Sequence, residues 1–386
     1  RDGVAFAEGK TWKRHRRFSS MAFHYDLLKL MVPEAVKIIQ ERFDRLQASD
    51  MSRVDILVEL QTITGEIVGR LFFGEDFSTI TLEGKPIVQY LAELVVGIAQ
   101  EIMNPINLML SPSFIKKGIL PRHKKILRRI HKFRDFGEKV ISQRMKDIAV
   151  QYNKDADRKS MLELFHEQRL QSQEDALKDN EILDEFCTFF FAGMDTTAHL
   201  VEIASYFYLT HPECQEKLLT EVKVNFGDPP KINIEMLNHM NYMTAFMKES
   251  LRMSTPTPML FDRTATEDHT LGEFKIKKGT LLNCAFLALN YDKKYHNEPM
   301  EFIPERWIEP SKTQESVSIN PYVYTPFSMG GRNCLGQHLA MIEAKLIFGL
   351  FIKRFNYELV DKNYKLIMTF KGLYEPEQSL IYKIIP

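Results

Sequence analysis

The chain has 386 residues, of which 44% are hydrophobic and 26% are charged, so its composition is that of a globular protein. Lys plus Arg and Asp plus Glu number 51 each, and this zero net charge argues against a dedicated nucleic-acid-binding protein. The four cysteines lie far apart without a Cys-x-x-Cys pair, which predicts reduced thiols rather than a zinc site or a disulfide framework.

Apolar residues at three- and four-residue spacing predict helices through the first two thirds of the chain. The predicted helices are Met31–Leu46, Val54–Phe73, Pro86–Met103, Arg122–Val150, Glu181–Leu209 and Asn233–Met253. Residues 154–179 are polar and predict a loop that contains a short helix. Residues 181–209 are apolar on nearly every side yet include acids, which predicts a buried core helix rather than a membrane span.

The composition of the sequence changes after the Thr-Pro-Thr-Pro segment at residues 255–258. Gly272 and Gly279 separate short runs rich in Thr, Phe and Ile, which predict hairpins. A last helix is predicted over Gln337–Phe355, followed by C-terminal strands. We therefore predict a mainly α fold with minor β: a single domain with a helical part over about residues 1–254 and a mixed β and loop part over about residues 255–386.

The strongest functional signal is the segment F-S-M-G-G-R-N-C-L-G at residues 327–336, directly ahead of the last predicted helix. The amino end of a helix favours a thiolate at Cys334. Glycines allow the backbone to turn tightly beside a flat ligand, and Arg332 offers a forked donor to an anion. A lone cysteine at such a turn is usually a buried free thiol. Phe327, Gly330 and Gly336 at fixed spacing make the combination too specific for chance.

This F-x-x-G-x-R-x-C-x-G pattern resembles the signature of the cytochrome P-450 family, and the chain resembles that family from end to end. The resemblance implies the triangular, mostly helical haem-thiolate fold, with haem b (iron protoporphyrin IX) as cofactor. Cys334 would be the proximal iron ligand, with Phe327 packed beside the sulfur. Backbone N–H groups after Cys334, around Gly336, would hydrogen-bond the thiolate and tune it.

Glu249 and Arg252 lie three residues apart on one predicted helix face, which alone usually indicates only a surface ion pair. In the family, this E-x-x-R pair joins an arginine of a P-E-R-F segment, which here reads Pro-Glu-Arg-Trp with Arg306 as the arginine. The resemblance therefore implies a buried structural triad of Glu249, Arg252 and Arg306 that locks the cysteine loop.

The segment Ala-Gly-Met-Asp-Thr-Thr at residues 192–197 interrupts the long apolar helix. Taken alone, it predicts a helix kink with a satisfied threonine. The resemblance implies that Gly193 leaves room for dioxygen, that Thr196 donates a hydrogen bond to the bound oxygen, and that Asp195 helps to supply protons from solvent.

Trp12 and Arg16 lie four residues apart on one helix face and match the family's W-x-x-x-R pair, which holds a haem propionate. Arg263 matches a further propionate partner and Arg332 would be another. Basic residues surround this end of the site, and the resemblance implies a docking face for an acidic electron-donating partner there. The basic residues are Lys10, Lys13, Arg14 and Arg17. A merely solvated basic helix is the alternative.

Three positions depart from the family pattern: Trp307 replaces the usual Phe, Asn290 an expected His, and His296 an expected Trp. These departures concern the subfamily more than the oxygen chemistry. Family members also carry residues ahead of the W-x-x-x-R helix, including a membrane anchor in eukaryotic members. We therefore expect the chain to be the C-terminal part of a longer protein, held on the cytosolic face of the endoplasmic reticulum membrane by its missing N-terminus.

Residues 114–134 contain nine Lys or Arg and no acid, with apolar residues between them. The simplest interpretation of this run is a solvated helix face. Contact with an anionic membrane surface is the sharper alternative, and nucleic acid lacks any supporting motif.

The resulting functional hypothesis is a haem-thiolate monooxygenase of the microsomal type, which inserts one oxygen atom of O2 into a lipophilic substrate. Its electrons would come from NADPH through a flavoprotein reductase. Apolar residues in 86–117, 189–193 and 256–261 would line the substrate pocket. A hydroperoxide-rearranging enzyme of the same fold, and a non-catalytic haem or ligand binder, remain as alternatives.

Overall fold

The computed structural model describes residues 3–104, 106–107, 117–118, 120–153, 156, 159–172, 174–227, 231–259, 262–308 and 320–385. Most of these residues are helical. The α-helices are α1 (Gly9–Met21), α2 (Tyr25–Gln47), α3 (Ile56–Val68), α4 (Ile87–Ile102), α7 (Pro121–Gln151), α8 (Met161–Gln171), α9 (Asp179–Thr210), α10 (Pro212–Phe226), α11 (Ile234–His239), α12 (Asn241–Met253), α13 (Phe286–Asn290) and α16 (Gln337–Arg354). A π-helical turn, Gly69–Phe73, continues α3, and 3-10 turns cover Pro304–Trp307, Pro321–Val323 and Gly330–Arg332.

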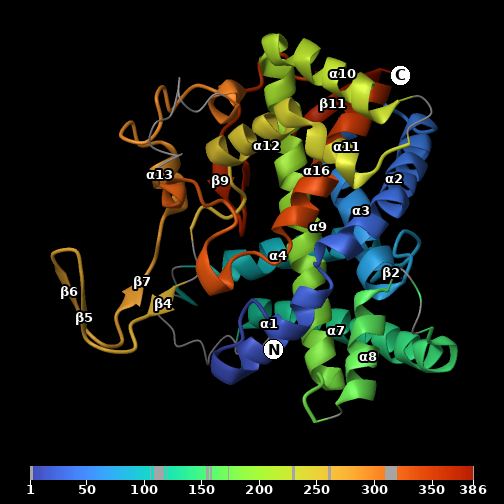
Figure 1. Cartoon of the computed structure of the whole chain (residues 1–386), viewed down its shortest axis with the longest axis vertical. Coiled ribbons are helices and arrows are strands. Elements are labelled where there is room, and N and C mark those ends of the chain that lie inside the picture. The colour runs from blue at the N-terminus through green and yellow to red at the C-terminus, as the bar shows by residue number, and fades with distance from the viewer. Residues whose placement is uncertain are drawn as a thin grey trace.

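The β structure consists of short antiparallel pieces. One three-stranded sheet has the order β1 (Val54–Asp55), β11 (Ile381–Ile385) and β8 (Asn356–Leu359). The other pairs are β2 (Thr81–Leu82) with β3 (Lys85–Pro86), β4 (Arg263–Thr264) with β7 (Leu281–Leu282), β5 (His269–Leu271) with β6 (Phe274–Ile276), and β9 (Met368–Phe370) with β10 (Tyr374–Pro376). The hairpin of β5 and β6 projects from the helical body (Figure 1). The prediction of a mainly α fold with minor β is thus confirmed.

Helix α9 forms the centre of the molecule, with α3 and α16 packed against it (Figure 1). Its apolar residues are buried on nearly every side, as the sequence predicts. Phe186 and Phe190 of α9 meet rings from the turn after α3: the Phe73–Phe186 centroids lie 4.7 Å apart and those of Phe77 and Phe190 lie 5.0 Å apart. This aromatic packing fixes α9 as the rigid support on which the rest of the fold is built.

The predicted helix over residues 233–253 is wrong in one respect, because the structure divides it at Met240 into α11 and α12. In a continuous helix, the Leu237 carbonyl would accept the N–H four residues later. Instead it accepts hydrogen bonds from the Met240 N–H at 3.3 Å and from the Lys345 ammonium of α16 at 2.6 Å. The first N–H groups of α12, from Tyr242 and Met243, are satisfied by the Glu221 carboxylate at 2.9 and 2.7 Å. Tertiary partners on α10 and α16 therefore stabilise the break.

The predicted helix over residues 54–73 is also modified. Val54 and Asp55 form β1 and pair with Tyr382 and Ile381 of β11, so the helix begins only at Ile56. Helix α10 was not predicted. Within the described residues, no helix is both long enough and apolar enough to cross a bilayer.

Candidate haem site

The cysteine loop is closed by its own backbone. The Cys334 N–H donates to the Phe327 carbonyl at 2.9 Å, and the Asn333 N–H donates to the Gly330 carbonyl at 3.1 Å. Gly330 adopts a φ of +77°, a left-handed conformation that favours glycine. Helix α16 begins three residues after the cysteine, at Gln337, as predicted. The loop therefore presents the sulfur at the amino end of a long helix.

Cys334 is exposed, but neighbouring protein atoms partly shield its thiol from water. Burial raises the pKa of the Cys334 thiol, while the backbone N–H of Gly336 and the positive charge of Arg16 lower it. These last two interactions favour a thiolate over a thiol. A sulfur that is accessible on one side and supported by an N–H and a guanidinium has the chemistry required of an iron ligand.

Three of the four predicted propionate-binding residues lie around this loop. Arg16 donates to both the backbone and side-chain oxygens of Asn333, at 2.6 Å each. The Arg332 guanidinium carbon lies 4.5 Å from the centroid of the Trp12 ring and its Nη2 donates to the Ala7 carbonyl at 2.7 Å. Helix α1 is thereby joined to the cysteine loop through both pairs.

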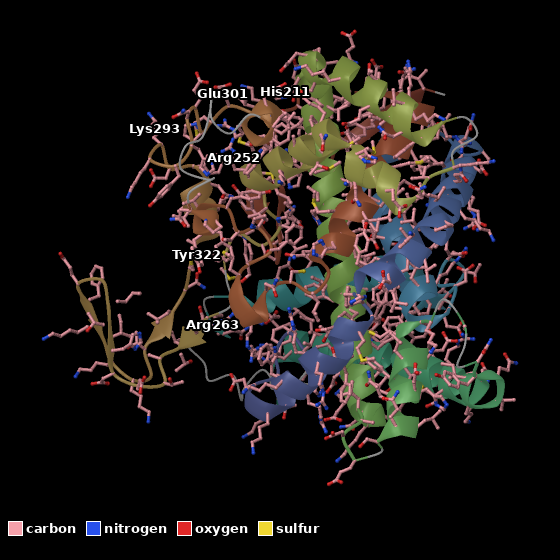
Figure 2. The ribbon with its side chains drawn as sticks, viewed as in Figure 1. His211, Arg252, Arg263, Lys293, Glu301 and Tyr322 are labelled. Atoms are coloured by element: carbon pink, nitrogen blue, oxygen red, sulfur yellow. The ribbon has the colours of Figure 1, made fainter. Side chains whose placement is uncertain are left out.

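Arg263, the fourth, lies in β4 at the base of the projecting hairpin (Figure 2). Burial lowers the pKa of Arg332, and the like charge of Arg263 lowers it further, while Glu8 acts in the opposite direction. Two guanidinium groups close enough to repel one another form a suitable site for an anionic group such as a carboxylate.

The middle of α9 has a solvent-accessible patch formed by Ala192, Gly193 and Thr196. Ala192 is exposed although most of this helix is buried, and Gly193 and Thr196 are partly exposed beside it. The Thr196 hydroxyl donates to the Ala192 carbonyl at 2.7 Å. Phe23 connects this region to the cysteine loop: its ring lies 5.5 Å from that of Phe189 on α9 and packs near Gly336.

Gly193 has an immediate structural role besides the predicted one. A Cβ added at Gly193 would come within 2.7 Å of the Val68 side chain, so the glycine allows α9 to pass close to α3. On the side that faces α3, the space beside Gly193 is therefore filled by the Val68 side chain.

Asp195 lies outside this accessible patch, in a buried position. Its Oδ1 accepts a hydrogen bond from Gln61 Nε2 at 2.7 Å and lies 3.4 Å from His199 Nδ1. Burial raises the pKa of Asp195, while His199 and Gln61 lower it. The carboxylate is thus held among polar partners on the α3 side of the helix rather than facing solvent directly.

His199 is a residue that the sequence analysis missed. Its Nε2 lies 3.1 Å from Glu375 Oε2, an ion pair that is not aligned as a hydrogen bond. Burial by itself would lower the pKa of His199, but the carboxylates of Glu375, Asp195 and Glu202 outweigh it and raise the pKa to about 10. A lone histidine four residues after an aspartate gave no signal, because its partner Glu375 is far away in the sequence.

The raised pKa of His199 predicts a pH-dependent stability. Its pKa in the unfolded chain is about 6.5, so the stabilising contribution is complete below that pH and is lost as the pH rises toward 10. We expect the difference in unfolding free energy between the wild type and His199→Gln to shrink between pH 7 and pH 10, in denaturant titrations at several pH values. A difference that stays constant or grows would show that His199 is neutral in the folded protein.

The three residues of the predicted structural triad lie in contact and are fully buried. Glu249 binds Arg252 through two hydrogen bonds of 2.9 and 3.0 Å, and Arg306 Nε donates to the same carboxylate at 2.9 Å. Trp307, the departure from the family pattern, donates its indole N–H to Glu249 at 2.9 Å. The backbone carbonyl of Asn290 accepts a hydrogen bond from Arg252 Nη1 at 2.8 Å. The aromatic substitution therefore adds a donor to the cluster.

The comparisons with known proteins agree with this geometry. The family model described as "Cytochrome P450" matches residues 1–384. The chain therefore belongs to the cytochrome P450 family, whose members are haem-thiolate monooxygenases. The accessible Cys334 sulfur and the arginines beside it fit the haem that this family uses.

Relatives come from plants and animals. The chain is 29% identical to "Cytochrome P450 CYP72A219" of Panax ginseng over 371 residues, covering 92% of this chain and 68% of that protein. It is 28% identical to "Cytochrome P450 4F11" of Homo sapiens, with 92% of this chain and 68% of that protein covered. It is also 28% identical to "Cytochrome P450 3A13" of Mus musculus, with 99% and 75% covered.

Proposed function

We propose that the protein inserts one oxygen atom of O2 into a lipophilic substrate, with electrons delivered from NADPH by a flavoprotein reductase. The observation that carries the proposal is the accessible Cys334 sulfur, supported by Gly336, Arg16 and the amino end of α16. When bound there, haem supplies the activation of oxygen. The residues of the chain hold this group, orient the substrate and manage protons.

Cys334 would ligate the iron, with Phe327 beside the sulfur. Trp12, Arg16, Arg263 and Arg332 would bind the propionates. The placement of Trp12, Arg16 and Arg332 around the loop supports this role, and the charge interaction of Arg263 with Arg332 supports it for Arg263. Glu249, Arg252 and Arg306 would keep the loop in place from the interior.

The accessible patch of α9 would face the reacting oxygen. Thr196 carries a hydroxyl there, and Asp195 lies next to it in the chain. A hydroxyl can both donate and accept a proton, so Thr196 would pass protons between Asp195 and the reaction centre. Gly193, which has no side chain of its own, would leave room beside the part of the helix that does not pack on α3.

Exposed apolar side chains near the expected pocket favour a lipophilic substrate. Ile102, Met103 and Ile106 are exposed at the end of α4, and Met259 is exposed ahead of β4. These residues belong to segments predicted to line the pocket. Residues 260–261, 105 and 108–116 of those segments lie outside the described part of the chain.

The reductase would dock on the basic face of α1. Lys10 and Lys13 are exposed there, whereas Arg14 pairs with Glu181, and Arg17 lies 3.7 Å from Asp175. These two exposed lysines offer positive charge to an acidic partner. We further propose that the protein is a single P450 domain that acts at the cytosolic face of the endoplasmic reticulum membrane.

Isotope labelling tests the reaction. The holoprotein is supplied with NADPH, a microsomal reductase and 18O2, with dodecanoic acid and testosterone as probe substrates, and products are analysed by mass spectrometry. The proposal predicts a product that contains one 18O atom and that requires both NADPH and the reductase. Conversion of a fatty-acid hydroperoxide without NADPH, together with no labelled product, would instead indicate a hydroperoxide-rearranging enzyme.

Replacing Thr196 with alanine is expected to uncouple electron use from product formation. NADPH oxidation would continue, while product per NADPH would fall by about tenfold or more because the proton-transferring hydroxyl is lost, and hydrogen peroxide would rise. Thr188→Ala is the matched control, because the Thr188 hydroxyl makes the same bond, to the Asp184 carbonyl at 2.8 Å, elsewhere on α9. Unchanged coupling in Thr196→Ala would remove Thr196 from the proton path.

A further inference from the structure

Ionisable side chains form a continuous row from the centre of α9 to the surface. Asp195 and His199 lie one turn apart, and His199 Nδ1 contacts both the Asp195 carbonyl, at 2.8 Å, and Asp195 Oδ1, at 3.4 Å. On the other side of the ring, Nε2 lies 3.1 Å from Glu375 Oε2 of β10. The imidazole therefore lies between two carboxylates that belong to different elements.

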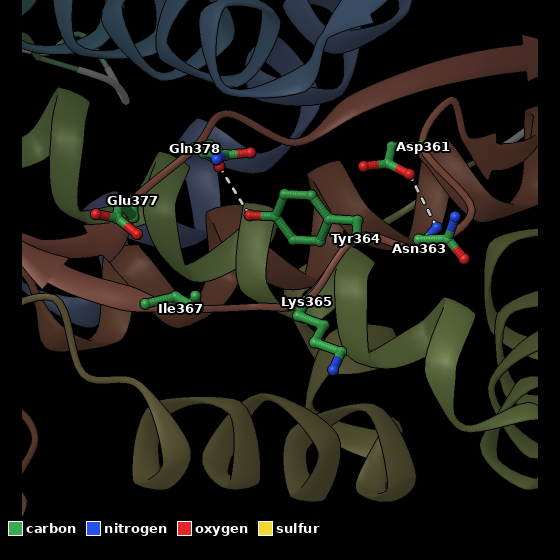
Figure 3. Close-up of a pocket in the computed structure, with 7 residues that line it drawn as sticks. All are labelled: Asp361, Asn363, Tyr364, Lys365, Ile367, Glu377 and Gln378. Carbon is green, nitrogen blue, oxygen red and sulfur yellow. Dashed lines mark hydrogen bonds between the residues drawn. The ribbon is translucent and has the colours of Figure 1, made fainter.

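The row continues outward from Glu375. Its Oε1 lies 3.4 Å from Lys371 Nζ, and the side chain of Lys371 is 35% exposed, against 12% for Glu375 and 2% for His199. Lys371 also donates to the Glu377 carbonyl at 3.0 Å. Glu377 lines a surface pocket, which Figure 3 shows together with Tyr364. Exposure thus rises step by step from α9 to solvent.

The other groups that face His199 are also ionisable. Glu202, one turn further along α9, is buried, and among the described residues neither of its carboxylate oxygens has a hydrogen-bond partner. Burial and, to a smaller extent, the charges of Asp55, Glu375 and Asp195 raise the pKa of Glu202 to about 7, although the charge of His199 opposes this rise. The carboxylates of Glu375, Asp195 and Glu202 therefore act on the imidazole together and hold the ring in its protonated, proton-donating form.

We propose that Lys371, Glu375 and His199 form the route by which protons from solvent reach Asp195. This inference rests on the proposed function, since Asp195 is the residue expected to supply protons beside Thr196. It adds three residues that the proposed function does not require: His199 on α9, Glu375 on β10 and Lys371 just before β10.

Each step of the route conserves protons. The imidazolium gives its Nδ1 proton to Asp195 Oδ1 and becomes neutral, while Asp195 becomes a carboxylic acid. A half-turn of the ring then presents the deprotonated nitrogen to Glu375. Glu375, protonated from solvent beside Lys371, gives its proton to that nitrogen and restores the imidazolium. The net result is the transfer of one proton from water to Asp195 without any change of oxidation state.

The exchange of the His199 ring protons with water tests the route directly. The holoprotein is labelled with 15N-histidine, reduced and bound to CO so that it is diamagnetic, and its His199 signals are identified by their loss in His199→Gln. We expect Glu375→Gln to slow the exchange by about tenfold or more at a pH where the 15N shifts show a protonated ring. Glu358→Gln, which removes an exposed carboxylate that pairs with Lys362, should leave the rate unchanged.

Equal exchange rates in the wild type and in Glu375→Gln would overturn the route and leave Glu375 a structural partner only. If Glu375→Gln does not fold, the exchange rate of Lys371→Met is compared with that of the wild type instead. This variant leaves the buried ion pair of His199 and Glu375 intact. The exchange rate requires no turnover. A protein that exchanges as predicted but forms no NADPH-dependent product would therefore contradict the proposed function and not the route.

Discussion

Replacing Glu249 with alanine is expected to lower the free energy of unfolding by about 3–5 kcal/mol. The side chains of Glu249, Arg252 and Arg306 are completely buried, so the two guanidinium groups would be left as uncompensated charges in the interior. The Trp307 indole N–H and the Ile303 backbone N–H, each 2.9 Å from the carboxylate, would lose their acceptor as well.

Equilibrium unfolding in urea measures this effect. Glu358→Ala is the control, because Glu358 is an exposed acid paired with Lys362, and a surface pair of this kind contributes less than about 1 kcal/mol. A loss of less than 1 kcal/mol for Glu249→Ala would contradict the structural role of the triad, since it would mean that water or other groups replace the carboxylate at no cost.

Replacing Cys334 with alanine is expected to abolish NADPH-dependent product formation. The side chain contributes little to packing, because it is exposed and its loop is closed by backbone hydrogen bonds from Cys334 to Phe327 and from Asn333 to Gly330. The variant should therefore fold with nearly wild-type stability while it loses the thiol at the amino end of α16. The expected result is a separation of activity from stability.

Cys284→Ala is the matched control, because Cys284 is also a free and exposed cysteine. It should retain product formation in the labelling assay with NADPH, reductase and 18O2. Substantial activity in Cys334→Ala, or equal losses in both variants, would contradict the assignment of Cys334 as the iron ligand.

Local sequence patterns predicted much of the fold because their physical causes are local. The apolar periodicity of α9 and α7 reflects the face that each helix buries, and the glycines and helix start around Cys334 follow from backbone geometry alone. The E-x-x-R spacing places Glu249 and Arg252 on one face of α12, so their contact is set within a single helix.

Features that depend on distant partners could not be predicted from these patterns. The break at Met240 exists because Lys345, more than a hundred residues away, binds the Leu237 carbonyl. The charged state of His199 depends on Glu375 in β10. Neither Lys345 nor Glu375 stands in a motif, so only the tertiary fold reveals which group each one satisfies.

The absorption spectrum of the reduced, CO-bound holoprotein tests the central claim most directly. If the Cys334 thiolate ligates the haem iron, the wild type will show the red-shifted Soret band of thiolate ligation, and Cys334→Ala will lack it. A wild-type Soret band at the position typical of imidazole-ligated haem, or a red-shifted band that persists in Cys334→Ala, would show that another group binds the iron.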